Sequence, residues 1–122
     1  MIKSFLFVGL GGSIGAILRY FITTVWKTEN FPFHTLFINI TGCFFIGIVF
    51  ALSEKTNLIT ENTKLFLATG ICGGFTTFSA FSLENFQLLK TGEYLTAGFY
   101  ILTSLAACIM ATFKAFTCCG AS

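Results

Sequence analysis

Charged residues are scarce in this chain: only 10% of its 122 residues are Asp, Glu, Lys or Arg, and the formal net charge is +2. The basic side chains are scattered and form no stripe, so the sequence offers no electrostatic footprint for nucleic acid, and we exclude that class of partner. It also lacks a metal-ligand cluster, a nucleophile–base pair and a phosphate-binding loop. We therefore predict that the protein is not an enzyme.

Cysteine is present, but not in a pattern that binds zinc. The five cysteines lack the paired spacing of a zinc site, and three of them fall inside apolar segments. They are Cys43, Cys72, Cys108, Cys118 and Cys119. We expect these side chains to act as small buried hydrophobic residues or as thiols of a tail.

Apolar residues are abundant instead, at 55% hydrophobic and 17% aromatic. A soluble domain of this size could not bury so much apolar surface, so lipid must be the solvent for most of it. A helix crosses a bilayer with about 20 apolar residues, and four such stretches fill the chain. We predict one four-helix transmembrane domain over 1–122, without a separate soluble domain. Its helices span about 4–26, 32–53, 64–89 and 94–113, followed by a short tail at 115–122.

The third stretch is expected to be broken near its middle. Its segment Gly70-Ile71-Cys72-Gly73-Gly74-Phe75-Thr76-Thr77 is a poor continuous helix. Glycine destabilises a helix interior, and threonine competes for backbone hydrogen bonds. Before it, Thr60 to Thr63 offer caps for the start of this helix.

The basic residues give almost no signal for orientation in the membrane. With four spans both termini lie on one side, so the basic residues can be counted by face. Lys3, Lys55, Lys64 and Lys114 lie on the terminal side, and Arg19, Lys27 and Lys90 lie toward the other. Because an excess of Lys and Arg sets topology, this near tie allows either insertion and permits an antiparallel dimer.

Small residues repeat in the first stretch, at Gly11 and Gly15 and at Gly12 and Ala16. This spacing lets helix backbones approach closely in lipid. We assign it a packing role and no chemistry.

The other three stretches carry uncharged polar side chains. Thr35, Asn39 and Cys43 share one face of the second stretch, Phe78, Phe81 and Ser82 lie together in the third, and Tyr100 and Ser104 share a face of the fourth. Asn39 either forms an interhelical hydrogen bond or serves a pathway. The phenylalanines are either core residues or part of the same polar interior.

Apart from Lys64 at the start of the third stretch, two charged residues fall within the expected spans. Arg19 is either an interfacial anchor or part of an ion entryway, where a cation would concentrate anions. Glu84 is expected in the same leaflet, so it either pairs with Arg19 or faces a water-filled vestibule, which we favour. The single histidine, His34, is expected to be a solvated or interfacial imidazole.

Three motifs, in this order and spacing, resemble the CrcB or Fluc family of fluoride channels. They are Gly11-Gly12-Ser13-Ile14-Gly15-Ala16-Ile17-Leu18-Arg19-Tyr20, Asn39-Ile40-Thr41-Gly42 and Gly70-Ile71-Cys72-Gly73-Gly74-Phe75-Thr76-Thr77-Phe78-Ser79-Ala80-Phe81. The resemblance extends from about residue 4 to residue 114. It implies an all-α antiparallel homodimer of dual topology, in a bacterial inner membrane, with two fluoride pathways and a structural sodium ion at its centre.

The resemblance also implies roles for individual residues. Main-chain carbonyls of Gly73 and Thr76 would hold the sodium ion, Phe78 and Phe81 would line the pore, Asn39 would be the pore amide, and Tyr100 and Ser104 would be polar positions of the fourth helix. A pore must replace the water around fluoride with convergent donors, and aromatic ring edges add weak attraction. Side chains that can donate are Asn39, Thr77, Ser79, Ser82, Tyr100 and Ser104.

The expected role is passive relief of fluoride toxicity. Neutral HF crosses the membrane and ionises in the more alkaline cytoplasm, and a channel lets the trapped anion run back out. The alternative is a small dual-topology multidrug exporter, which couples export to protons through a membrane carboxylate. Only Glu84 could serve that purpose. A scaffold protein without transport would not need polar residues on three helices.

Overall fold

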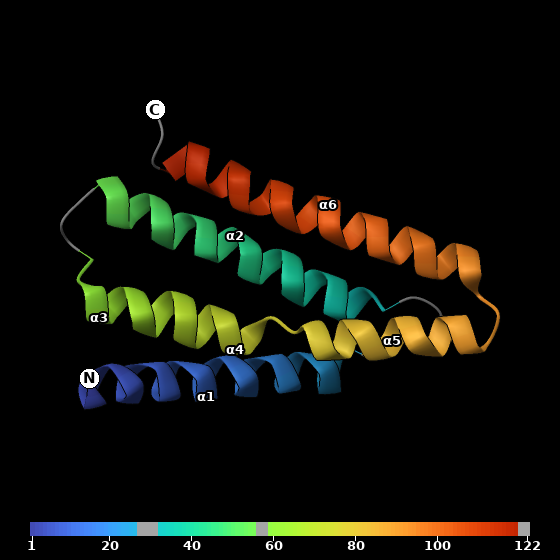
Figure 1. Ribbon diagram of the computed structural model, residues 1–122, viewed down its shortest axis with the longest axis horizontal. Helices are drawn as coiled ribbons and strands as arrows, with labels where there is room; N and C mark the ends of the chain where they lie inside the picture. Colours follow the sequence, from blue (N-terminus) through green and yellow to red (C-terminus); the bar gives the residue numbers. More distant parts are fainter. Residues whose placement is uncertain (27–31, 56–58, 120–122) are drawn as a thin grey trace.

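The computed structural model describes residues 1–26, 32–55 and 59–119, in which every regular element is a helix. The elements are α1 (Ile2–Val25), α2 (Phe33–Lys55), α3 (Glu61–Lys64), the π-helical η1 (Leu65–Cys72), α4 (Gly73–Phe75), α5 (Phe78–Lys90) and α6 (Tyr94–Cys119). Figure 1 shows α3, η1, α4 and α5 as one interrupted rod, here called the third span.

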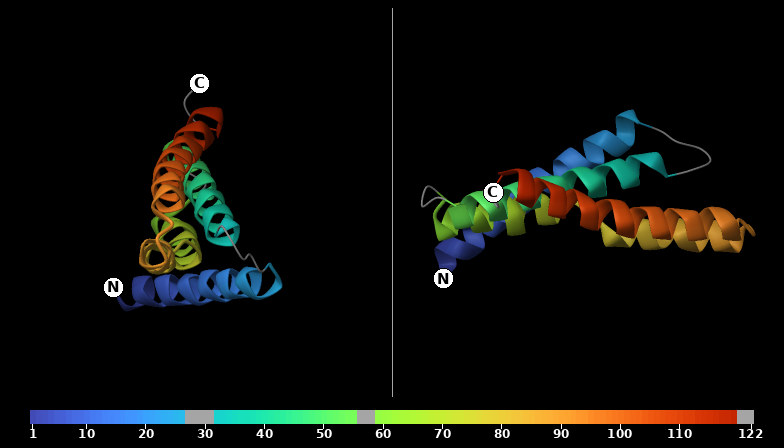
Figure 2. Two further views of the ribbon diagram at one scale, coloured as in Figure 1. Left: turned by 90° about the vertical axis from the view of Figure 1, so that its right-hand side faces the viewer. Right: turned by 90° about the horizontal axis from the view of Figure 1, so that it is seen from above.

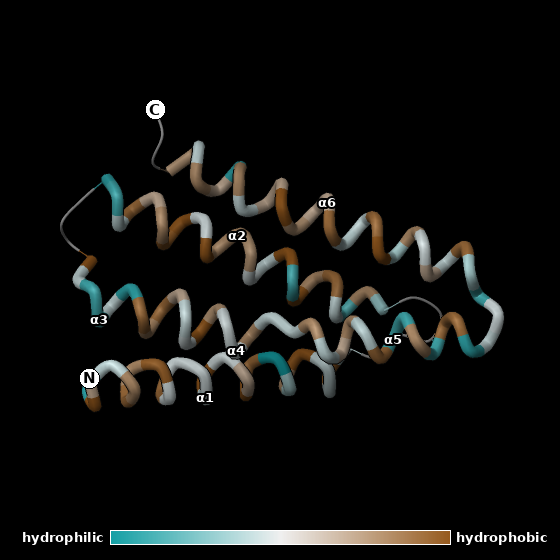
Figure 3. The backbone as a smooth tube through the Cα atoms, viewed as in Figure 1, coloured by the Kyte–Doolittle hydropathy of each residue, from teal (hydrophilic) through white to brown (hydrophobic). Residues whose placement is uncertain are grey.

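The predicted fold class is confirmed, because four of these segments are long and apolar enough to cross a membrane. Figure 3 shows hydrophobic positions along most of α1, α2 and α6, whereas hydrophilic and hydrophobic positions alternate along α5. Thr60 caps the third span as expected, since its side chain accepts a hydrogen bond from the Thr63 N–H at 3.2 Å.

The predicted end of the last helix was wrong. α6 does not stop near Phe113 but continues to Cys119, so the first part of the expected tail is helical. These added residues are small or apolar apart from Lys114 and Thr117, and none is a helix breaker. Residues 120–122 of the tail, and Lys27 of the charge count, lie outside the described residues.

The spans alternate in direction, which places the two chain ends at the same end of the molecule. α1 and the third span run one way, and α2 and α6 run the other (Figures 1 and 2). α2 packs against α6 and η1, while α1 packs against η1 and α4 at an angle to the remaining helices (Figure 2).

Glycines bring α1 into backbone contact with the third span, as their spacing predicts. A Cβ atom on Gly11 would lie 2.8 Å from the Gly70 Cα atom, and one on Gly15 would lie 2.7 Å from the Phe75 backbone nitrogen. Both distances are too short for any side chain. Lipid provides no hydrophobic force between helices, so this close packing is what attaches α1.

We expect Gly11→Ala to destabilise the protein, because the added methyl group meets backbone that cannot move independently. Forcing a methyl group into a packed interface costs about 1–3 kcal/mol. Thermal unfolding in detergent measures the loss. Gly9→Ala is the matched control, because a Cβ atom there has nothing within 4 Å. Equal stability of the two variants would contradict this packing role.

Candidate functional site

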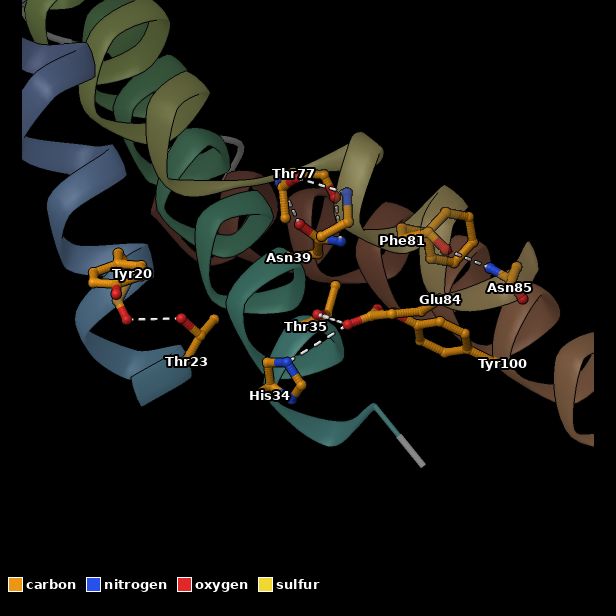
Figure 4. Close-up of polar contacts among 11 residues, drawn as sticks. Tyr20, Thr23, His34, Thr35, Asn39, Thr77, Phe81, Glu84, Asn85 and Tyr100 are labelled. Atoms are coloured by element: carbon orange, nitrogen blue, oxygen red, sulfur yellow. Dashed lines mark hydrogen bonds and ion pairs between the residues drawn. The ribbon is translucent and has the colours of Figure 1, made fainter. Parts of the chain in front are cut away.

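The break in the third span is held by the side chain of Asn39 on α2. Its Nδ2 donates to the Thr77 carbonyl oxygen at 3.1 Å, and its Oδ1 accepts from the Thr77 N–H at 2.8 Å (Figure 4). The side-chain amide of Asn39 thus gives Thr77, which lies outside the helix, the two hydrogen bonds that another backbone peptide group would otherwise form. Nδ2 carries a second N–H, for which no acceptor is found among the described residues.

At the break, two N–H groups that would donate to backbone carbonyls in a continuous helix donate to side-chain oxygens instead. Thr76 and Thr77 are extended, with φ/ψ of −76°/156° and −147°/125°. In a continuous helix the Thr77 N–H would donate to Gly73 and the Ala80 N–H to Thr76. Here they donate to Asn39 Oδ1 and to Thr77 Oγ1 (3.1 Å) instead. The carbonyls of Gly73 and Thr76 are thereby released from these helical bonds.

Arg19 also contacts the break. Its Nε donates to the Gly74 carbonyl oxygen at 3.2 Å, in a partly buried contact. A cation at the C-terminal end of a helical segment is favourable, because unpaired carbonyls give that end a negative partial charge. This contact holds the guanidinium beside the break, so Arg19 does more than anchor α1 at the interface.

An open pocket of about 240 Å³ lies beside the break, between α2, α5 and α6. We call it the break pocket, and it is lined by Asn39, Cys43, Thr76, Thr77, Phe78, Phe81, Ser104, Leu105, Cys108 and Ile109. It brings together five of the predicted pore residues from three spans. Ser104 Oγ is buried there and has no hydrogen-bond partner among the described residues.

Aromatic rings connect the break pocket to the interior. The Phe81 ring is 8% exposed, with its centroid 5.5 Å from that of Phe78 and 5.0 Å from that of Tyr100. Tyr100 is fully buried and does not line the pocket, whereas Phe78 lines it while being 74% exposed. The three rings form a continuous row from α5 to α6.

Beyond this row lies a polar cluster around Glu84. Its carboxylate accepts hydrogen bonds from Thr35 Oγ1 at 2.7 Å and from the Tyr100 hydroxyl at 2.8 Å. His34 Nε2 lies 3.5 Å from Glu84 Oε2 (Figure 4). His34 lies at the start of α2, and the fold brings it against a carboxylate of another span, a partner that the expectation of a solvated or interfacial imidazole did not include.

Arg19 and Glu84 contact different partners and form no ion pair with each other in the described structure. The pairing that the sequence left open is thus not formed. The other two predicted donors, Ser79 and Ser82, are exposed and lie outside the break pocket. Ser79 Oγ lies 3.1 Å from Thr77 Oγ1, at the start of α5.

Some residues of this region were not predicted as site residues. Thr35 was placed on the same helical face as Asn39, and its burial is consistent with that face pointing inward. Cys108 and His34 carried no signal of their own, because their neighbours come from spans far away in the sequence.

Comparison with known proteins identifies the family. Residues 6–116 match the family model described as CrcB-like protein, Camphor Resistance (CrcB). The chain belongs to the CrcB-like family. The match covers all four spans and includes every residue assigned above to the break pocket. Four apolar spans and bacterial relatives together make this CrcB-like chain a multi-pass bacterial membrane protein.

Several CrcB-like relatives carry the name "Fluoride-specific ion channel FluC". The chain is 48% identical over 110 residues to the protein from Azobacteroides pseudotrichonymphae, with 88% of each chain covered. It is 45% identical over 113 residues to the protein from Flavobacterium psychrophilum, covering 90% of this chain and 91% of the relative. A similar protein from Chlorobium chlorochromatii is 46% identical, with 82% and 79% covered.

Proposed function

We propose that this chain is a subunit of a fluoride-selective channel, through which cytoplasmic fluoride leaves the cell passively. The break pocket carries this proposal, because it places amide and hydroxyl groups from three spans at membrane depth. Relatives with nearly half of their residues in common are named as fluoride channels, which supports the same substrate.

The pathway would use uncharged donors in place of the water around fluoride. Asn39, with one N–H that has no acceptor among the described residues, and Ser104, with an unpartnered hydroxyl, line the same pocket. Fixed donors compensate dehydration, while the absence of a cation in the pocket lining lets the ion leave again. Phe78 and Phe81 add the positive edges of their rings. We keep Thr77, Ser79, Ser82 and Tyr100 as further pore residues of this proposal.

A sodium ion shared with a second copy in an antiparallel dimer is part of the proposal. Gly73 and Thr76 would hold it through main-chain carbonyls, which the break releases from the helical bonds described above. Oxygen ligands suit a hard cation, and irregular backbone is tolerated at membrane depth when it is buried in protein. Gly73 is exposed in the single chain, which leaves it open to a second subunit. When bound, the ion would neutralise the carbonyl dipoles at the break.

We assign Arg19 and Glu84 to an entryway and expect Glu84→Gln to lower fluoride flux about tenfold and to change the pH dependence of that flux. The Thr35 and Tyr100 hydroxyls donate to different oxygens of the Glu84 carboxylate, and a glutamine presents an NH₂ donor in place of one of these acceptors. A hydrogen bond to a charged group contributes roughly 1.5–3 kcal/mol, and 1.4 kcal/mol corresponds to about tenfold. Flux from liposomes measured over a pH series tests this.

Glu61→Gln is the matched control for Glu84→Gln, because Glu61 is exposed at the start of the third span. If Glu84→Gln and Arg19→Gln both lower thermal stability while flux and its pH profile stay unchanged, the two residues are structural. The entryway assignment would then be wrong.

Fluoride efflux from liposomes that contain the purified protein tests the proposed function. We expect passive release of fluoride and far slower release of chloride, since the donors suit a small, strongly accepting anion. Equal rates for the two anions would overturn the proposal. Proton-dependent export of a lipophilic cation would instead favour the multidrug exporter, which the family match argues against.

A further inference from the structure

Two cysteines that the proposed pathway does not use lie side by side in the membrane. Cys43 on α2 and Cys108 on α6 line the same two pockets, and both are free thiols. Thr112 Oγ1 donates to the Cys43 carbonyl oxygen at 2.9 Å, and a Cβ atom on Gly47 would lie 2.9 Å from the Ala115 Cβ atom. These contacts fix α2 against α6 around the two cysteines.

The thiol pair can be reached from two pockets. Cys43 and Cys108 line the break pocket, and both also line a second open pocket of about 550 Å³. The other residues of the second pocket are Gly47, Phe50, Ile109, Thr112, Phe113 and Phe116. Each thiol is only partly buried. The pair thus stands at the boundary between the two pockets.

We propose that Cys43 and Cys108 form a binding site for a soft metal cation of the Cu⁺, Ag⁺ or Hg²⁺ class. Thiolate ligands select soft ions, and these ions accept two sulfur ligands in a nearly linear arrangement. The described residues contain no group of three or more His, Cys, Asp or Glu that could hold a metal ion. They therefore form no four-ligand zinc site. With Hg²⁺, both S–H bonds break, two S–Hg bonds form and two protons are released.

A bound ion would also stop fluoride conduction. It would bridge α2 to α6 in the wall of the break pocket that contains Asn39 and Ser104. The bis-thiolate complex of Hg²⁺ carries no net charge, so the block would be steric: the metal would occupy space that the anion needs. This consequence rests on the proposed function. Metal binding itself does not, and it is measured separately.

Mercuric ion is the probe, and the double variant Cys118→Ser/Cys119→Ser is the background, because it removes the adjacent thiols at the end of α6. In this background we expect one Hg²⁺ per chain, the ultraviolet absorption of a bis-thiolate complex and the release of two protons. Fluoride efflux should fall at least tenfold and return after dithiothreitol.

Adding Cys43→Ser or Cys108→Ser should abolish the bis-thiolate absorption, and alanine variants repeat the test where serine impairs folding. Cys72→Ser is the matched control, since Cys72 is a buried thiol of η1 and its loss leaves the pair intact. Bis-thiolate absorption that survives loss of both thiols, or is missing in the background, overturns the site. If Hg²⁺ binds and fluoride efflux is unchanged, the proposed block of conduction is wrong. A protein that conducts no fluoride before Hg²⁺ is added refutes the proposed function instead, and the absorption still reports on the site.

Discussion

Asn39→Asp is expected to abolish fluoride flux. The substitution exchanges Nδ2, which donates to the Thr77 carbonyl oxygen, for an oxygen that repels it. Loss of a donor that leaves a buried partner unsatisfied costs about 1–3 kcal/mol, or roughly 5-fold to 150-fold. A carboxylate in the lining of the break pocket would also repel the anion, and the second N–H of Asn39 would be lost. The lost hydrogen bond and the repulsion of the anion both lower fluoride flux.

Liposome efflux measures the effect, and size-exclusion chromatography in detergent shows whether the assembly survives. We expect the proposed dimer to persist, since Asn39 contacts the third span of its own chain. Asn62→Asp in α3 makes the same chemical change away from the break and should conduct normally. Undiminished flux in Asn39→Asp would remove Asn39 from the pathway.

Phe81→Ile is expected to lower fluoride flux more than tenfold while the protein stays folded. The ring lies between Phe78 and Tyr100 and lines the break pocket, so isoleucine removes the aromatic edge at the centre of the row. A hydrophobic swap that nearly conserves volume costs less than about 1.5 kcal/mol, which a membrane domain can tolerate. Phe78→Ile should act in the same direction.

Phe86→Ile is the matched control, because Phe86 lies on the same helix, is 60% exposed and does not line the break pocket. Efflux and thermal unfolding are compared for the variants. If Phe81→Ile and Phe86→Ile conduct alike, or if the loss of flux follows the loss of stability, the ring of Phe81 serves packing only.

The sequence by itself determined the spans, the break and the helix packing through α1. Spans are visible because lipid requires about 20 apolar residues in a row. The break is visible because glycine and threonine between Gly70 and Thr77 weaken a helix, and the structure places the interruption at Thr76 and Thr77. The glycines at positions 11 and 15 predicted close contact, which the structure confirms against η1 and α4. Each of these features is predicted from residues that lie close together in the sequence of one span.

Only the tertiary structure decided which side chains from different spans meet. Asn39 binds the backbone of Thr77, Glu84 joins His34, Thr35 and Tyr100, and Arg19 contacts Gly74 instead of Glu84. Helical periodicity gives the face of each side chain but neither the rotation nor the axial offset between two helices. Those follow from how closely the small residues let the backbones approach, and that depends on all the spans packing at once.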